Sequence, residues 1–133
     1  SRDGHGLKML QRNGVEVGII TGRNSEIVAH RTRELGINHV RQGCADKLPA
    51  YQEMIAALGL RHEQVGFVGD DVVDLPIMLR VGLAVCPQDG HFLVRRHSHW
   101  VTPSVGGRGC AREVCELVML AHGVFGAEMQ RYY

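Results

Sequence analysis

Short apolar segments that alternate with amphipathic helical segments constrain the fold of this chain more than any other feature. "VEVGII" at 15–20, "QVGFVGD" at 64–70 and "GLAVC" at 82–86 are rich in branched apolar residues. Such runs are typical of strands buried in a parallel sheet. Two weaker strands are predicted, from "INHVRQG" at 37–43 and "HWVTP" at 99–103.

Helical patterns separate these strands. Residues 24–36 predict a helix with Asn24 as its N-cap and Gly36 at its end. Residues 46–59 predict a second helix between Asp46 and Gly59. A helix is also expected to begin near Asp3, with a short one at 75–80 and a last one at 110–122. Two apolar faces follow from the helical period: Leu48, Tyr51, Ile55 and Leu58, and then Val114, Leu117, Val118 and Ala121.

Strands that alternate with helices predict an α/β fold, with a parallel sheet and helices on both of its faces. We find no repeat or linker, so residues 1–133 are expected to form a single domain. Hydrophobic residues make up 44% of the chain and charged residues 22%, as in ordinary globular proteins. The net charge of +1 argues against nucleic-acid partners, and no apolar run approaches the roughly 20 residues of a membrane span.

Cysteines and histidines give no metal-binding pattern. Cys44, Cys86, Cys110 and Cys115 contain no CxxC pair, so we expect buried, reduced thiols in a cytoplasmic protein. His91, His97 and His99 lie close together in the sequence. Because no cysteine or carboxylate accompanies them, we interpret them as surface histidines and not as metal ligands.

Polar residues follow the strands at one predicted edge of the sheet. Thr21, Gly22 and Arg23 end the 15–20 strand, and "GDD" ends the 64–70 strand. Lys47 begins a helix at the same edge. Parallel strands place ligand sites at their carboxyl ends. A hydroxyl, a glycine and helix N-terminal amides suit a phosphate, although the same sequence also suits a structural turn. Lys47 is equally compatible with a bound anion and with a solvated side chain.

Asp70, Asp71 and Asp74 are the strongest functional signal. Carboxylates at a strand end suit Mg²⁺, which takes one or two of them and keeps several waters. One of the three is expected to cap the following helix instead. Receiver domains of response regulators also combine aspartates, a threonine and a lysine. Their order along the chain is different, however, so this interpretation is disfavoured.

The order Thr-Gly-Arg, then Lys, then GDDxxD resembles three motifs of the haloacid dehalogenase superfamily. "RDGHGLKMLQRNGVEVGIITGR", "DKLPAY", "GDDVVDLPIMLRVGLAV" and "GGRGCAREVCELV" are similar to its 3-deoxy-D-manno-octulosonate 8-phosphate phosphatases. This resemblance covers nearly the whole chain. It implies a Rossmann-like core without a large cap domain, and Mg²⁺-dependent hydrolysis of a sugar-acid phosphate in lipopolysaccharide biosynthesis.

The resemblance also implies roles for single residues. Asp70 would bind the metal, while Asp71 and Asp74 would support the metal and orient Lys47. Thr21, Gly22 and Lys47 would bind the phosphoryl group. Arg23 and Arg108 would contact the rest of the substrate. The family acts through an aspartyl phosphate formed on the first aspartate of a DxDG motif, with the second aspartate as general acid and base.

That DxDG motif is missing, since no DxD occurs among the 133 residues. In the family it ends a first strand in the middle of the sheet. We therefore expect an N-terminally incomplete domain with a gap between the 15–20 and 64–70 strands, inactive by itself. Asp3 is no substitute, because no strand precedes it. The alternative is a non-catalytic, phosphatase-like oligomerisation module. For the complete enzyme the resemblance implies a homotetramer with a small-molecule substrate.

Overall fold

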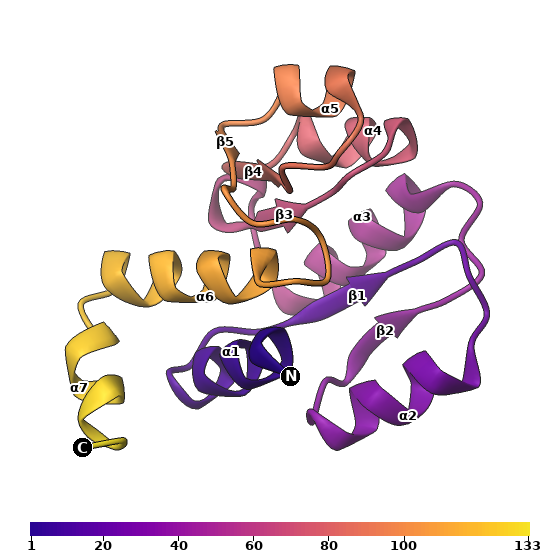
Figure 1. Ribbon diagram of the computed structural model, residues 1–133. Coiled ribbons are helices and arrows are strands. Elements are labelled where there is room, and N and C mark those ends of the chain that lie inside the picture. The colour runs from indigo at the N-terminus through magenta and orange to yellow at the C-terminus, as the bar shows by residue number, and fades with distance from the viewer.

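The computed structural model describes residues 1–133 as a mixed α/β fold (Figure 1). The strands are β1 (Gly18–Ile20), β2 (His39–Arg41), β3 (Gly66–Val68), β4 (Leu83–Cys86) and β5 (Trp100–Val101). The helices are α1 (Arg2–Arg12), α2 (Glu26–Glu34), α3 (Lys47–Leu58), α4 (Leu75–Met78), α5 (Phe92–Arg96), α6 (Cys110–Ala121) and α7 (Phe125–Gln130). Two 3₁₀ turns, η1 (His62–Gln64) and η2 (Val72–Asp74), flank β3. None of the helices has both the length and the apolar character that a membrane span requires.

All strand pairs are parallel, as the sequence predicts, but they form two separate sheets. β1 pairs with β2, and β4 pairs with both β3 and β5. β1 and β3 share no ladder, so each presents a free backbone edge toward the space between the sheets. The expected gap is therefore present.

Each sheet has its own hydrophobic core. Two clusters of buried side chains are separate from each other, and α1 and α6 supply most of the one beside β1. The cluster beside β4 contains Tyr51, Ile77, Met78, Val81, Ala84, Cys86 and Val94, and the other contains Met9, Leu10, Val17, Ile37, Cys115 and Met119.

Burial of the predicted strands differs between the sheets. Ala84, Val85 and Cys86 of β4 are fully buried, as expected. The prediction is wrong for β1 and β3, where Gly18 and Gly66 are exposed and Val68 is 41% exposed. These residues border the open space between the sheets, where no further strand covers them.

Most predicted helix ends agree with the structure. Asp46 caps α3 by accepting a hydrogen bond from the amide of Leu48, and Gly59 ends that helix at a φ of 67°. The N-cap of α2 is Ser25 and not Asn24. Ser25 has extended backbone angles, and its hydroxyl accepts from the amide of Val28 at 3.3 Å.

The predicted apolar face of α6 is not its most buried face. Cys110, Cys115 and Met119 are buried, because α1 packs along that side. The predicted residues Val114, Leu117, Val118 and Ala121 instead line the space between the two sheets. The pattern identified apolar residues correctly but not the surface that they face.

Candidate functional site

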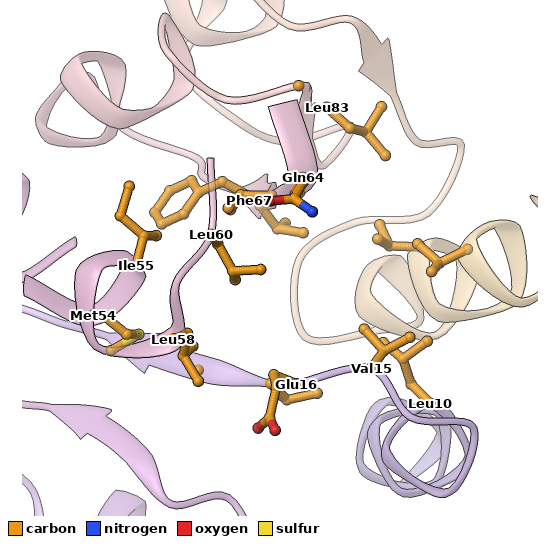
Figure 2. A pocket seen from close by; sticks show the side chains of 18 of the residues that line it. Leu10, Val15, Glu16, Met54, Ile55, Leu58, Leu60, Gln64, Phe67 and Leu83 are labelled. Carbon is orange, nitrogen blue, oxygen red and sulfur yellow. The ribbon is translucent and has the colours of Figure 1, made fainter. Parts of the chain in front are cut away.

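Figure 2 shows the apolar part of a groove that runs between the free edges of β1 and β3. This part has a volume of about 680 Å³, and most of its lining residues are hydrophobic. Phe67 of β3 and Ile55 of α3 line it, and Glu16 and Gln64 are among its few polar side chains. A second part of about 440 Å³ shares the β1 and β3 edges and contains Lys47, Asp70 and Asp74. An apolar groove thus leads to the polar carboxyl edge of both sheets.

Asp74 organises this polar end. Its side chain is only 3% exposed, and its Oδ1 lies 2.7 Å from Nζ of Lys47. Its Oδ2 accepts hydrogen bonds from the amides of Asp70, at 3.0 Å, and Asp71, at 3.2 Å. With both oxygens engaged, Asp74 positions Lys47 and holds the turn after β3.

Asp71 caps the turn that follows. Its Oδ1 accepts a hydrogen bond from the amide of Val72 at 2.7 Å, at the start of η2. Of the two carboxylates expected to orient Lys47, only Asp74 forms an ion pair with it. One of the three aspartates was expected to act as a cap, and Asp71 does so.

Asp70 is the aspartate whose carboxylate remains available. Asp70 is exposed and lines the polar end of the groove, and its carboxylate accepts no hydrogen bond from the protein. The turn requires the glycine before it, since a Cβ on Gly69 would lie 2.6 Å from Cβ of Asp74. No three side chains of metal-binding type gather here. Asp70 alone still fits Mg²⁺, which binds through as little as one carboxylate together with water and phosphate oxygens.

The Thr-Gly-Arg segment forms a tight turn after β1. The hydroxyl oxygen of Thr21 accepts from the amide of Arg23 at 3.2 Å, which leaves the hydroxyl proton free to be donated. Gly22 passes close to the backbone of residue 44, and a Cβ would lie 3.4 Å from that carbonyl oxygen. Thr21 and Arg23 lie outside the set of residues that line the groove.

A glycine-rich loop, residues 104–109, also contributes to the lining of the polar end. Gly106 and Gly107 line the groove, whereas Arg108 is exposed and its guanidinium has no protein partner. The groove therefore brings Lys47, Asp70 and Asp74 together with two glycines of this loop, and not with Arg108 itself.

Two of the three histidines that lie close together in the sequence, His91 and His99, form structural hydrogen bonds, whereas His97 is exposed. Nδ1 of His99 accepts from the amide of Ala84 at 2.7 Å, and Nδ1 of His91 accepts from the amide of Leu93 at 3.1 Å. They form no group that could hold a metal ion.

Sequence reasoning missed two carboxylates that hold the glycine-rich loop, Asp89 and Asp3. Asp89 accepts from the amide of Gly106 at 2.9 Å. Asp3 accepts from the amides of Gly109, at 3.4 Å, and Arg112, at 3.0 Å. Asp89 lies in a Pro-Gln-Asp-Gly turn, which is a weak signal, and no local signal connects Asp3 with a loop more than a hundred residues away.

Comparison with known proteins gives consistent results. A profile described as haloacid dehalogenase-like hydrolase matches residues 5–82. The 3-deoxy-D-manno-octulosonate 8-phosphate phosphatase KdsC of Yersinia pestis is 47% identical over 120 residues, which are 90% of this chain and 64% of that protein. The Escherichia coli K12 protein of the same name is 43% identical over 122 residues, 92% of this chain and 65% of that protein. The chain thus spans just under two thirds of the length of these curated relatives.

Solved structures agree with this assignment. The phosphatase structure from Yersinia pestis is 45% identical with a TM-score of 0.93, covering 94% of this chain and 68% of that one. The Moraxella catarrhalis phosphatase, solved in complex with a magnesium ion, a phosphate ion and a KDO molecule, is 37% identical with a TM-score of 0.96. There the coverage is 99% of this chain and 76% of that one. On the profile match and on these similarities, the chain belongs to the haloacid dehalogenase-like hydrolase family.

Proposed function

We propose that these residues form the metal- and phosphate-binding part of a Mg²⁺-dependent phosphatase that hydrolyses 3-deoxy-D-manno-octulosonate 8-phosphate in lipopolysaccharide biosynthesis. The observation that carries the proposal is the pairing of Lys47 with buried Asp74 beside the unpaired carboxylate of Asp70. A cation and a free carboxylate at one strand edge suit a phosphate and its metal ion. The similarity to named phosphatases supports the choice of substrate.

Different side chains would bind different parts of the substrate. Lys47 gives one N–H to Asp74 and keeps two more, which would bind phosphoryl oxygens. The hydroxyl of Thr21 would donate its free proton to the same phosphoryl group, beside the backbone turn at Gly22. Arg23 and Arg108, both exposed, would pair with the sugar-acid carboxylate. Magnesium bound by Asp70 would supply neutralisation of charge on the phosphoryl group.

The attacking carboxylate is the part that this chain does not provide. We propose that an extended strand ending in DxDG fills the groove between β1 and β3. Both facing edges have unpaired backbone groups, and the groove walls are apolar. A strand there would pair on both sides, and its carboxyl end would lie beside Lys47 and Asp70. Its first aspartate would attack phosphorus as the sugar oxygen leaves, and its second would protonate that oxygen.

A second candidate is a non-catalytic oligomerisation module. The observation that this candidate would explain is that no DxD occurs among the 133 residues. The two functions differ in one respect that can be measured, since only the phosphatase releases phosphate.

The test uses a polypeptide in which an apolar strand ending in DxDG precedes Ser1. We expect phosphate release from 3-deoxy-D-manno-octulosonate 8-phosphate that requires Mg²⁺ and stops with EDTA. The matched variants are Asp70→Asn, expected to reduce the rate at limiting Mg²⁺ by more than tenfold, and Glu53→Ala, an exposed carboxylate of α3 that should have no effect. No release, or release that persists in EDTA, would contradict the proposal.

We further propose that the complete enzyme is a cytoplasmic homotetramer. Light scattering during size-exclusion chromatography would give its mass. A monomer would overturn the proposed tetramer but not the proposed phosphatase activity.

A further inference from the structure

The glycine-rich loop, residues 104–109, contributes to the same polar end of the groove as Lys47 and Asp70. Gly106 and Gly107 line the polar end of the groove. Gly107 has a φ of 75°, and its amide donates to no protein acceptor. Neither residue has a side chain, and the amide of Gly106 is bonded to Asp89, so the N–H of Gly107 is the donor that this loop offers to a ligand.

Asp89 connects this loop to the turn that follows β4. Its Oδ1 accepts the amide hydrogen of Gly106 at 2.9 Å. Next to it, the amide of Gln88 donates to the carbonyl oxygen of Ser104 at 3.2 Å. Two adjacent residues therefore hold the first half of the loop.

The same turn is also joined to Asp70. The amide of His91 donates to the carbonyl oxygen of Asp70 at 2.8 Å. Gly90 also lies beside Asp70, since a Cβ there would be in van der Waals contact with Cα of Asp70, at 3.5 Å. Residues 88–91 thus connect Asp70 with the glycine-rich loop.

The far end of the loop is held separately. Gly109, at a φ of 115°, begins α6 without a side-chain cap of its own. Asp3 of α1 accepts from the amides of Gly109 and Arg112 in its place. With this end fixed, the hydrogen bond from Gly106 to Asp89 sets the position of the loop at the groove.

We propose that Asp89 is a positioning residue that holds Gly106 and Gly107 against the sugar-acid part of the substrate. This rests on the proposed phosphatase function, in which Lys47 and Asp70, at the same end of the groove, bind the phosphoryl group. Asp89 acts through the loop and is exposed, so its removal costs the fold little.

The experiment compares Asp89→Ala, Asp89→Asn and Glu53→Ala in the polypeptide completed with the DxDG strand. Two esters are used, 3-deoxy-D-manno-octulosonate 8-phosphate and p-nitrophenyl phosphate, which has no sugar acid. Loss of one hydrogen bond predicts that Asp89→Ala raises KM for the sugar-acid ester about fivefold to tenfold. Its kcat/KM for p-nitrophenyl phosphate stays within about twofold, because one amide contact to the sugar acid is all that changes. Asp89→Asn, which keeps an acceptor oxygen, restores the low KM.

Three results would overturn the proposal: an unchanged KM in Asp89→Ala, an equal loss on both esters, or an Asp89→Asn variant as impaired as Asp89→Ala. Hydrogen exchange distinguishes a failure of the positioning role of Asp89 from a failure of the proposed phosphatase function. Exchange at Gly106 should accelerate in Asp89→Ala whether or not the enzyme is active. If the unsubstituted enzyme hydrolyses neither ester, both the phosphatase function and the substrate role of Asp89 are wrong, and exchange then reports only on the anchoring of the loop.

Discussion

Lys47 takes part both in the stability of the fold and in the proposed phosphate site. A lysine in the first turn of a helix is mildly unfavourable, because the helix dipole is positive there. The nearly buried carboxylate of Asp74 offsets this, at 2.7 Å from Nζ. The ion pair leaves Lys47 with unused N–H donors that face the groove.

Replacing Lys47 by alanine should therefore destabilise the fold as well as remove a proposed phosphate ligand. Asp74 would keep its two amide donors but lose its charged partner. We expect the free energy of unfolding to fall by about 1–3 kcal/mol. Urea unfolding measures this, with Lys8→Ala as the control, since Lys8 is exposed and makes no ion pair. Equal stability of the two variants would show that the pair contributes nothing.

Thiol reactivity should distinguish Cys44 from the other cysteines. Burial raises the pKa of Cys86, of Cys110 and of Cys115, the last to about 11. Cys44 is only half-buried. In the folded protein at pH 8, Ellman's reagent should modify one thiol rapidly and the other three only after unfolding. A second thiol that reacts as fast as Cys44 would be inconsistent with the packing described.

At the scale of elements, the packing of α1 against α6 depends on a glycine. A Cβ on Gly6 would lie 3.2 Å from Cα of Arg112 and 2.8 Å from its Cδ. Gly126, within α7, has nothing within 4 Å of such a Cβ. The two glycines therefore provide a matched pair of helical positions.

Alanine at these two positions should change stability in opposite directions. Gly6→Ala should lower the free energy of unfolding by about 1–3 kcal/mol, because α1 must move away from α6. Gly126→Ala should raise it by about 0.5–1 kcal/mol, because alanine favours the helix. Thermal unfolding followed by circular dichroism checks both, and a stabilising Gly6→Ala would refute the close contact.

The attachment of α7 to α1 should depend on pH. Burial favours the neutral form of Glu128, but the hydrogen bond and charge of Arg12 outweigh this and hold the pKa of that carboxyl below its ordinary value. A lowered carboxyl pKa gives stability that is present above the ordinary pKa of about 4.5 and is lost as the pH falls through the lowered value.

Unfolding measured between pH 3 and pH 7 therefore provides a test. The unsubstituted protein should lose more stability in acid than Glu128→Gln, which cannot form the charged pair. If the free energy of unfolding depends on pH in the same way in both proteins, the ion pair of Arg12 with Glu128 does not stabilise the folded state.

Local patterns determined which elements and site residues could be predicted. The five strands and the capping of α3 follow from neighbouring residues. The position of Lys47 and GDDVVD at one edge follows from the parallel arrangement of those strands. The short helices α5 and α7 were not predicted, although the still shorter α4 was, because segments of four to six residues give no reliable helical period. The roles of Asp3 and Asp89 depend on contacts between distant segments, which no local pattern reports.

For the molecule as a whole, the groove between β1 and β3 is the dominant feature. It separates two sheets and two cores, and it exposes strand residues whose sequence is typical of a buried sheet. The apolar face of α6, predicted from its sequence, also lines this groove. A single inserted strand would explain all three observations, because it would join the sheets and cover these residues.

Phosphate release by the 133-residue chain, with and without that strand, tests this account most directly. With Mg²⁺ and 3-deoxy-D-manno-octulosonate 8-phosphate, the chain alone should release none. The polypeptide with a DxDG strand before Ser1 should release phosphate, and changing the first aspartate of that motif to asparagine should abolish the release. Mg²⁺-dependent release by residues 1–133 alone would contradict the account, because the attacking group would then lie within the chain.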